Sequence, residues 1–192
     1  MIICFIGNMG GGKTLSMTNA LFKSHKDKHK VISNYTLNFK HDVLSMDLLK
    51  SYHTSNKQIE NSSFGIDEAH IFLDSRNFMS KSNKIISYFL LQTRKRGIKA
   101  YLSFQKYNQI DIRIRQNASF LVDCESYELI GNKLYLLTEG EPIFSQDNVW
   151  IKQTWFKSDK DVNWKLHKKV MLKASDLYNK YNTKEIINFN EE

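Results

Sequence analysis

The sequence contains only two cysteines and one proline in 192 residues, and no apolar run long enough to cross a membrane. Cys4 and Cys124 lie inside apolar segments without a C-x-x-C spacing, which argues against a zinc site and for a reducing compartment. A membrane-spanning helix needs about 20 apolar residues, and the opening MIICFI is too short and too poor in basic residues for a signal peptide. We therefore expect a soluble protein of the cytoplasm.

Basic residues outnumber acidic ones, and apolar residues are plentiful. The chain has 28 Lys and Arg against 20 Asp and Glu, and 41% of its residues are hydrophobic, enough for one sizeable core. The net charge of +8 suits a polyanionic partner such as nucleic acid. A lysine-rich protein can also be basic without such a partner, so charge alone does not decide between these alternatives.

Strand-like and helix-like segments alternate along the first two thirds of the chain. Ile2–Ile6 has no polar alternation, as expected of a strand buried on both faces of a parallel sheet. Further strands are expected at 31–39, 98–105 and 119–124, with a short strand-like segment at the start of 64–74, and helices at 13–25, 42–52 and 83–96, the last ending at Gly97. This order predicts an α/β fold with a mostly parallel central sheet flanked by helices.

Residues 1–192 are expected to form a single domain. Its nucleotide-binding core covers about residues 1–125, and its β-rich extension about 126–192, with a β-ribbon at 127–156 and a helix at 175–181. We find no internal repeat and no low-complexity linker.

The segment GNMGGGKT matches the phosphate-loop pattern G-x-x-x-x-G-K-[ST] and stands between a buried strand and a helix, as the mechanism requires. Its glycines allow backbone N–H groups to turn toward phosphates, next to a helix N-terminus. Lys13 is expected to reach the β- and γ-phosphates of ATP, and the Thr14 hydroxyl to ligate Mg²⁺. The residues expected to bind nucleotide are Gly7, Asn8, Met9, Gly10, Gly11, Gly12, Lys13 and Thr14.

A pair of acidic residues follows a short apolar segment in FGIDEAH. Asp67 is expected on the metal side of the site, and Glu68 is expected to polarise the attacking water. Because Ser62, Ser63 and Gly65 interrupt the preceding strand, we expect that strand to be short or to lie partly at an edge.

The segment from Leu91 to Glu125 resembles the FtsK/HerA superfamily of DNA-pumping ATPases. It has a helix ending in basic residues and glycine, a strand ending in Gln, and a basic segment ending in Asn before the next strand. The nearest branch comprises the viral genome-packaging ATPases and the ATPase domain of zonular occludens toxin-like phage assembly proteins. SNY after the second strand, IDEAH, and LYNKYNT near the C-terminus support this branch, and the resemblance implies a RecA-like fold.

The resemblance also implies roles for polar residues outside the phosphate loop. Gln105 corresponds to the sensor of the γ-phosphate, a role that suits a side chain able to donate and accept hydrogen bonds. An arginine from a neighbouring subunit stabilises the transition state in this family. The candidates are Arg94 and Arg96, which we favour, and Arg113 and Arg115.

The segment IDIRIR alternates isoleucine with charged residues. If it is extended, Arg113 and Arg115 share one face and could contact a phosphate backbone or another subunit.

The resemblance implies an ATPase that translocates double-stranded DNA into a viral capsid as a homo-oligomeric ring, most simply a hexamer. Such a protein would act in the cytoplasm of the host cell, visit the virion vertex and contact capsid proteins. The alternatives are a thymidine kinase-like nucleoside kinase, a filamentous-phage assembly ATPase and a nucleotide-binding adaptor. The kinase would normally bring C-x-x-C zinc ligands, and the assembly ATPase a membrane segment, and neither is found in the sequence.

Overall fold

The computed structural model describes residues 1–51, 59–71, 81–140, 142–159 and 163–181. The first half of the chain alternates strands and helices: β1 (Ile2–Ile6), α1 (Lys13–Lys26), β2 (Lys30–Ser33), β3 (Asp42–Val43), α2 (Met46–Ser51), β4 (Ser62–Ile66), α3 (Lys81–Gln92) and β5 (Lys99–Ser103). The second half consists of α4 (Ile112–Asn117), β6 (Phe120–Ile130), β7 (Lys133–Leu136), β8 (Val149–Ser158) and β9 (Trp164–Lys173). Short turns of 3-10 helix join several of these elements.

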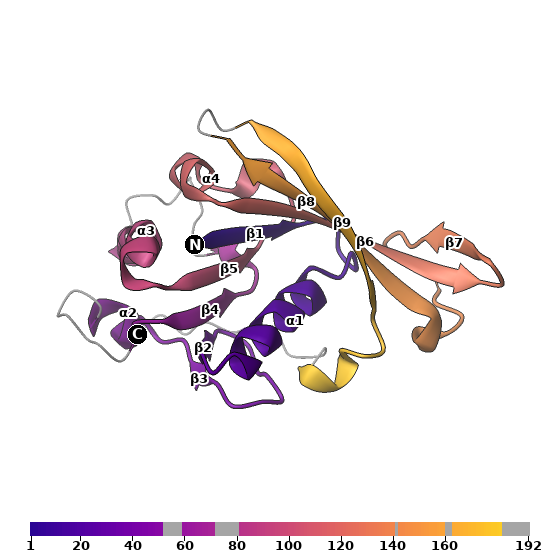
Figure 1. Cartoon of the computed structure of the whole chain (residues 1–192), viewed down its shortest axis with the longest axis horizontal. Helices are drawn as coiled ribbons and strands as arrows, with labels where there is room; N and C mark the ends of the chain where they lie inside the picture. Colours follow the sequence, from indigo (N-terminus) through magenta and orange to yellow (C-terminus); the bar gives the residue numbers. More distant parts are fainter. Residues whose placement is uncertain (52–58, 72–80, 141, 160–162, 182–192) are drawn as a thin grey trace.

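All nine strands belong to one sheet, with the order β3-β2-β4-β5-β1-β6-β8-β9 and with β7 paired to β6. The six strands from β3 to β6 are parallel, whereas β7, β8 and β9 are antiparallel to their neighbours. The expected α/β fold with a mostly parallel sheet is confirmed. In Figure 1 the parallel strands lie beside the helices, and the long antiparallel strands extend away from them.

Helices cover both faces of the parallel part of the sheet. Successive side chains of β1 lie on opposite faces of the sheet. Ile2 and Cys4 pack with α2, α3 and α4, while Ile3 and Phe5 pack with α1. These four side chains are at most 4% exposed, which is why the sequence of β1 has no polar alternation. Helices on both faces therefore fix β1 in the sheet, and its carboxyl end leads to the start of α1.

The strand before the acidic pair is central, and its expected edge position was wrong. β4 pairs with β2 on one side and β5 on the other, and all five of its residues are buried. A Cβ on Gly65 would lie 2.4 Å from Leu21 Cδ1, so the missing side chain lets α1 pack closely on the strand. The small residues therefore indicate close packing rather than exposure.

Two other expectations need correction. The helix expected at 42–52 is shorter: α2 covers Met46–Ser51, while Val43 belongs to β3 and is 74% exposed. The expected helix at 175–181 is a 3-10 turn, Tyr178–Lys180.

The β-rich third continues the central sheet, because β6 runs through residue 125 and its Phe120–Glu128 pairs with β8.

Residues 110–115 form no strand. Asp111 caps α4 by accepting a hydrogen bond from the Arg113 backbone N–H at 2.8 Å, and Ile110 and Ile114 are buried. A capping aspartate and apolar residues four apart stabilise a helix start, so the apparent alternation does not produce an extended chain. Residues two apart on a helix point in different directions, and Arg113 and Arg115 therefore do not share a face.

Candidate nucleotide-binding site

The phosphate loop runs from the carboxyl end of β1 into α1. Gly12 stands before the first turn of α1 with φ 81°, and the Gly11 N–H donates to Asn8 O at 3.0 Å. A Cβ on Gly7 would lie 2.3 Å from Cys124 O, and one on Gly12 would lie 2.6 Å from Ile151 Cδ1. β6 and β8 therefore press against the loop and leave no room for side chains at these two glycines.

The outer rim of the loop opens to solvent. Asn8, Met9 and Gly10 are exposed, and the Ser126 hydroxyl of β6 donates to Gly10 O at 2.5 Å. One side of the loop is thus held by the sheet while the other is accessible, as a cradle for an anion requires.

The Lys13 side chain folds over the loop. Its ammonium donates to Asn8 O at 2.8 Å, and the residue is only 6% exposed. This contact fixes a positive charge within the loop, next to the N-terminus of α1, where the helix dipole also favours a negative ligand.

Asp67 joins the loop to the acidic pair. Its two carboxylate oxygens accept from the Thr14 hydroxyl at 3.1 and 2.9 Å, and it is 7% exposed. Because hydroxyl and carboxylate oxygens are the ligands that Mg²⁺ prefers, this donor set fits the ion that the sequence predicts.

Two residues of neighbouring strands orient Asp67. Ser103 of β5 donates to Asp67 Oδ1 and accepts from the Glu68 N–H at 2.8 Å. The Asn34 amide, just after β2, accepts from the Asp67 N–H at 2.7 Å and donates to Asp67 O at 2.9 Å. Sequence reasoning assigned no role to Ser103 or Asn34; only the position of SNY after a strand pointed to Asn34.

Glu68 has a backbone conformation that favours glycine, with φ 49°. Its carboxylate Oε2 lies 3.2 Å from His70 Nδ1, and both side chains are about 30% exposed. The turn that begins at Glu68 closes with the Ile71 N–H donating to Glu68 O at 2.9 Å. An ionisable side chain held partly open beside the phosphate loop can accept a proton from water or orient one.

Gln105 lies two residues beyond β5, between the strands that lead to Asp67 and to the phosphate loop. The preceding Phe104 N–H donates to Phe5 O of β1 at 2.8 Å, which fixes the chain at this edge. Gln105 is half-buried, and the structure places it at the same carboxyl edge as Glu68 and Lys13.

The candidate arginines lie elsewhere. Arg94 and Arg96 belong to the turn Thr93–Arg96, which precedes the amino end of β5, opposite the edge that carries the phosphate loop. Arg113 binds Asp111 through two side-chain hydrogen bonds of 3.0 Å, and the Arg115 guanidinium lies 5.2 Å from the centre of the Tyr107 ring. Arg94 and Arg96 therefore lie away from the phosphate loop of their own chain.

Both cysteines are core residues. Burial raises the pKa of the Cys4 and Cys124 thiols to about 12, so both are neutral at physiological pH. Cys124 supports the loop through its backbone carbonyl, which faces Gly7. Among the described residues, no helix is long and apolar enough to cross a membrane.

The chain matches one family model, described as zonular occludens toxin (Zot), over residues 1–148. No curated protein matches the chain in sequence.

Solved structures share the fold. The N-terminal domain of zonular occludens toxin from Neisseria meningitidis is 19% identical, with a TM-score of 0.56 over 94% of this chain and 98% of that chain. B204, the DNA-packaging ATPase from Sulfolobus Turreted Icosahedral Virus, is 15% identical, with a TM-score of 0.55 over 87% of this chain and 96% of that chain. The genome packaging NTPase B204 from Sulfolobus turreted icosahedral virus 2, in complex with ATP-gammaS, is 13% identical, with a TM-score of 0.56 over 87% and 96%.

Proposed function

Because the chain belongs to the zonular occludens toxin (Zot) family, and because its phosphate loop contacts an acidic strand end, we propose that it hydrolyses ATP to translocate double-stranded DNA during virus assembly. The observation that carries the proposal is the direct contact between Thr14 and Asp67, which makes the loop and the acidic pair one site.

The phosphate loop binds the triphosphate of ATP in this proposal. Its backbone N–H groups and the N-terminus of α1 face the phosphates, and the Lys13 ammonium exchanges its bond to Asn8 O for one to the β- and γ-phosphates. Thr14 and Asp67 would hold Mg²⁺, which when bound neutralises charge on the phosphate oxygens.

Glu68 and Gln105 act on the attacking water. The Glu68 carboxylate accepts its proton or orients it in line with the γ-phosphate, and Gln105 reports whether that phosphate is present. Ser103 connects the proposed metal ligand Asp67 with Glu68, because its hydroxyl contacts both the Asp67 carboxylate and the Glu68 backbone.

The DNA substrate is inferred from charge and similarity. The net charge of +8 favours a polyanion, and contacts to phosphates alone would allow movement independent of base sequence. The names of the B204 structures associate this fold with genome packaging in other viruses. We extend that association to this chain, acting as a hexameric ring that delivers DNA to a capsid.

Assembly of a filamentous phage is the second candidate. The Zot match over residues 1–148 favours this candidate, because the ATPase domain that the sequence resembles is that of zonular occludens toxin-like phage assembly proteins. Its nucleic-acid substrate could then be single-stranded. Neither the family match nor the fold comparisons favour a nucleoside kinase.

ATP turnover by the purified protein tests both candidates. We expect linear double-stranded DNA to stimulate turnover, and the stimulation to decline as salt rises from about 50 to 200 mM, because phosphate contacts release counterions. Lys13→Ala should abolish turnover without unfolding the chain. Stimulation by single-stranded DNA alone would favour phage assembly, whereas turnover retained by Lys13→Ala would remove the site assignment.

A further inference from the structure

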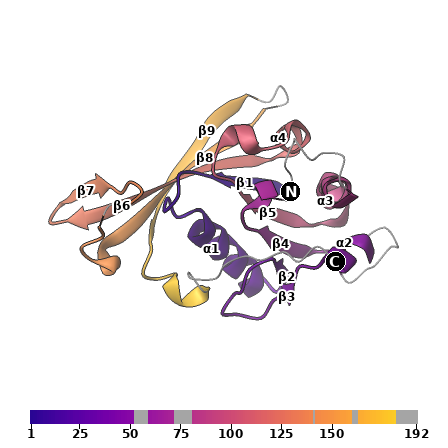
Figure 2. The same ribbon diagram turned by 180° about the vertical axis from the view of Figure 1, so that it is seen from behind.

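An extended arm projects from the sheet beyond the phosphate loop. We define the arm as residues 127–140 and 142–148: the end of β6, the hairpin to β7 and the described part of the connection to β8. In both Figure 1 and Figure 2 the β6–β7 hairpin points away from α1 and from the body of the molecule. The arm exposes six large apolar side chains, each between 45% and 81% exposed: Ile130, Leu134, Tyr135, Leu136, Ile143 and Phe144.

The backbone at the most exposed of these residues is held in place. Glu128 of β6 is 2% exposed, and its carboxylate accepts from the Phe144 N–H at 3.2 Å and from the Ser145 N–H at 2.6 Å. A buried carboxylate thus fixes the backbone at Phe144, while the Phe144 ring is 81% exposed. A protruding aromatic ring is typical of a contact that anchors a partner.

The arm is also acidic within a basic chain. Residues 128–148 contain four carboxylates and one lysine, a net charge of −3, whereas the whole chain carries +8. Glu139 and Asp147 are exposed. A partner for the arm therefore needs an apolar recess surrounded by positive charge.

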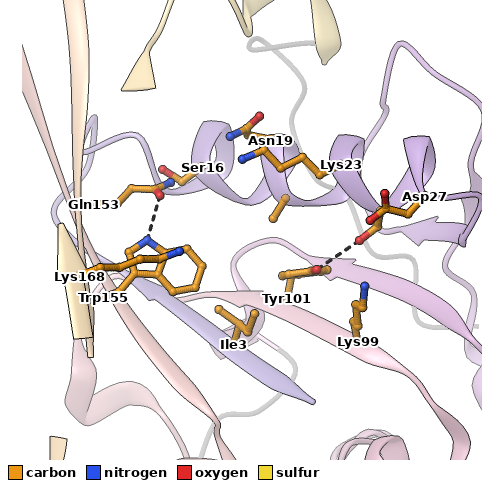
Figure 3. Close-up of a pocket in the computed structure, with 12 residues that line it drawn as sticks. Ile3, Ser16, Asn19, Lys23, Asp27, Lys99, Tyr101, Gln153, Trp155 and Lys168 are labelled. Atoms are coloured by element: carbon orange, nitrogen blue, oxygen red, sulfur yellow. Dashed lines mark hydrogen bonds between the residues drawn. The ribbon is translucent and has the colours of Figure 1, made fainter. Parts of the chain in front are cut away.

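A recess with a partly apolar lining and a basic rim lies on the flank of α1. A cavity of about 240 Å³ lies between α1 and strands β1, β5, β8 and β9, as Figure 3 shows. Ile3, Ala20, Tyr101 and Trp155 form the apolar part of its lining, and uncharged polar residues line the rest: Ser16, Asn19, Ser24 and Gln153. Because a cavity of roughly 150 Å³ can hold benzene, this one has room for a phenyl ring.

Three lysines surround the cavity: Lys23, Lys99 and Lys168. The Lys168 ammonium lies 4.7 Å from the centre of the Trp155 ring, and the Trp155 indole N–H donates to Gln153 Oε1 at 3.1 Å. Within the described part of the chain, none of the three lysines pairs with a carboxylate. Asp27 is the one carboxylate in the lining, so the rim is positive.

We propose that the arm of one copy docks on the α1 flank of a second copy, with Phe144 in the cavity and the arm carboxylates facing its lysines. The β6–β7 hairpin points away from α1 of its own chain (Figures 1 and 2), so the surface that it can meet belongs to a second copy. Different surfaces of the two copies meet, so repetition of the contact closes a ring or extends a filament. The proposal takes the ring from the proposed function and assigns its interface.

The contact would connect neighbouring nucleotide sites. The arm begins directly after Ser126 of β6, whose hydroxyl donates a hydrogen bond to Gly10 O of the phosphate loop. At the receiving surface, Arg94 and Lys99 both lie near the Met1 amino group, whose pKa is lowered by burial and by these two positive charges. Docking at Lys99 therefore brings the edge carrying Arg94 toward the neighbour's phosphate loop.

Cross-linking of two single-cysteine variants tests the docking. Cys4 and Cys124 are buried, so a short bismaleimide will react with introduced cysteines. Mixed Ile143→Cys and Asn19→Cys proteins, which keep Phe144 and the cavity lysines, should form a covalent dimer. The matched control pairs Ile143→Cys with Tyr88→Cys, which is 57% exposed on α3, and should form at least tenfold less dimer. Equal cross-linking to Tyr88→Cys, or no dimer in either mixture, would overturn the proposal.

Charge reversal supplies a second measurement. Lys99→Glu combined with Lys168→Glu should weaken self-association at least tenfold in sedimentation, whereas Lys40→Glu with Lys106→Glu, the same charge change at exposed sites, should not. Self-association that is insensitive to the cavity variant contradicts the docking. ATP turnover is recorded for the same samples: association that depends on the cavity lysines but shows no turnover refutes the proposed function alone, and turnover by assemblies that the cavity variant does not weaken refutes the docking alone.

Discussion

Asp67 is the residue at which three strands and the phosphate loop meet. Thr14 and Ser103 contact its carboxylate, and the Asn34 amide binds its backbone on both sides. A buried carboxylate is stable only when such partners replace water. The sequence could identify Asp67 from the distance between two motifs. It could not identify Asn34 or Ser103, because their roles depend on which strands become neighbours.

Ser103→Ala tests the connection between Asp67 and Glu68. The variant leaves the Glu68 N–H without its partner and removes one of two hydrogen bonds to Asp67 Oδ1, so we expect about 1–3 kcal/mol lower stability and at least tenfold slower ATP turnover. The control is Ser62→Ala, which removes a buried hydroxyl of β4 that donates to Ile59 O. It should lose stability but retain turnover. Equal turnover in the two variants would show that Ser103 does not position the site.

Asp111→Asn tests the charge pair that begins α4. The Arg113 guanidinium lowers the pKa of the Asp111 carboxyl below its ordinary value of 3.8. A lowered pKa stabilises the folded chain above pH 3.8, and this contribution disappears as the pH falls through the folded-state pKa. Asparagine retains the helix cap, so at pH 7 the variant should lose only about 0.5 kcal/mol, since Arg113 is partly exposed.

Urea unfolding of both proteins at pH 7 and in acid below pH 3.8 measures this difference. The gap in unfolding free energy should shrink in acid. A gap that widens as the pH falls would contradict the assignment of the pair.

Among the elements, the phosphate loop depends most on its surroundings. Its pattern was readable from the sequence because glycines, lysine and threonine have fixed spacing. The residues that support the loop could not be identified from the sequence. The loop packs against the Cys124 carbonyl of β6 and against Ile151 of β8, both more than 100 residues away. Helices α1 and α3 were predictable from their periodicity and from Gly97, which has φ 66° as a helix-ending glycine should.

The wrongly predicted elements share a cause. For β4, serine and glycine were taken as signs of exposure, although they allow the close approach of α1. For residues 110–115, alternating isoleucines suggested a strand, but the Asp111 cap and burial of Ile110 and Ile114 favour a helix. In both cases tertiary packing, which a local pattern does not contain, decided the structure.

Two glycine substitutions separate backbone strain from packing within the loop. Gly10→Ala and Gly12→Ala both place a side chain at positive φ, a cost of about 1–2 kcal/mol. Only the Gly12 methyl meets Ile151, whereas nothing lies within 4 Å of the position at Gly10. We expect Gly12→Ala to weaken binding of a fluorescent ATP analogue at least tenfold more than Gly10→Ala. Similar affinities would mean that β8 does not shape the loop.

At the scale of the whole molecule, the sheet has two functions. Its parallel half places Lys13, Asp67, Glu68 and Gln105 at one edge, and its antiparallel half carries the arm and one wall of the basic cavity. Arg94 and Arg96 lie at the opposite edge from the nucleotide site. We propose that a neighbouring subunit supplies the arginine to this site.

Mixed rings test the sharing of sites. Arg94→Ala or Arg96→Ala subunits, and Glu68→Gln subunits, should each be at least 100-fold less active alone, since an arginine supplied in trans contributes roughly 10³–10⁵ in rate. Mixtures should regain part of the activity, because some interfaces combine an intact arginine with an intact Glu68. If no mixture recovers turnover at any ratio, the arginines do not act between subunits.

Translocation along double-stranded DNA is the central claim, and displacement of a triplex-forming strand from linear duplex measures it directly. The protein with ATP should release the third strand, and Glu68→Gln, which should bind ATP without hydrolysing it, should not. Release should take longer when the triplex lies farther from the duplex end. ATP hydrolysis without release of the third strand, or release by Glu68→Gln, would contradict the account.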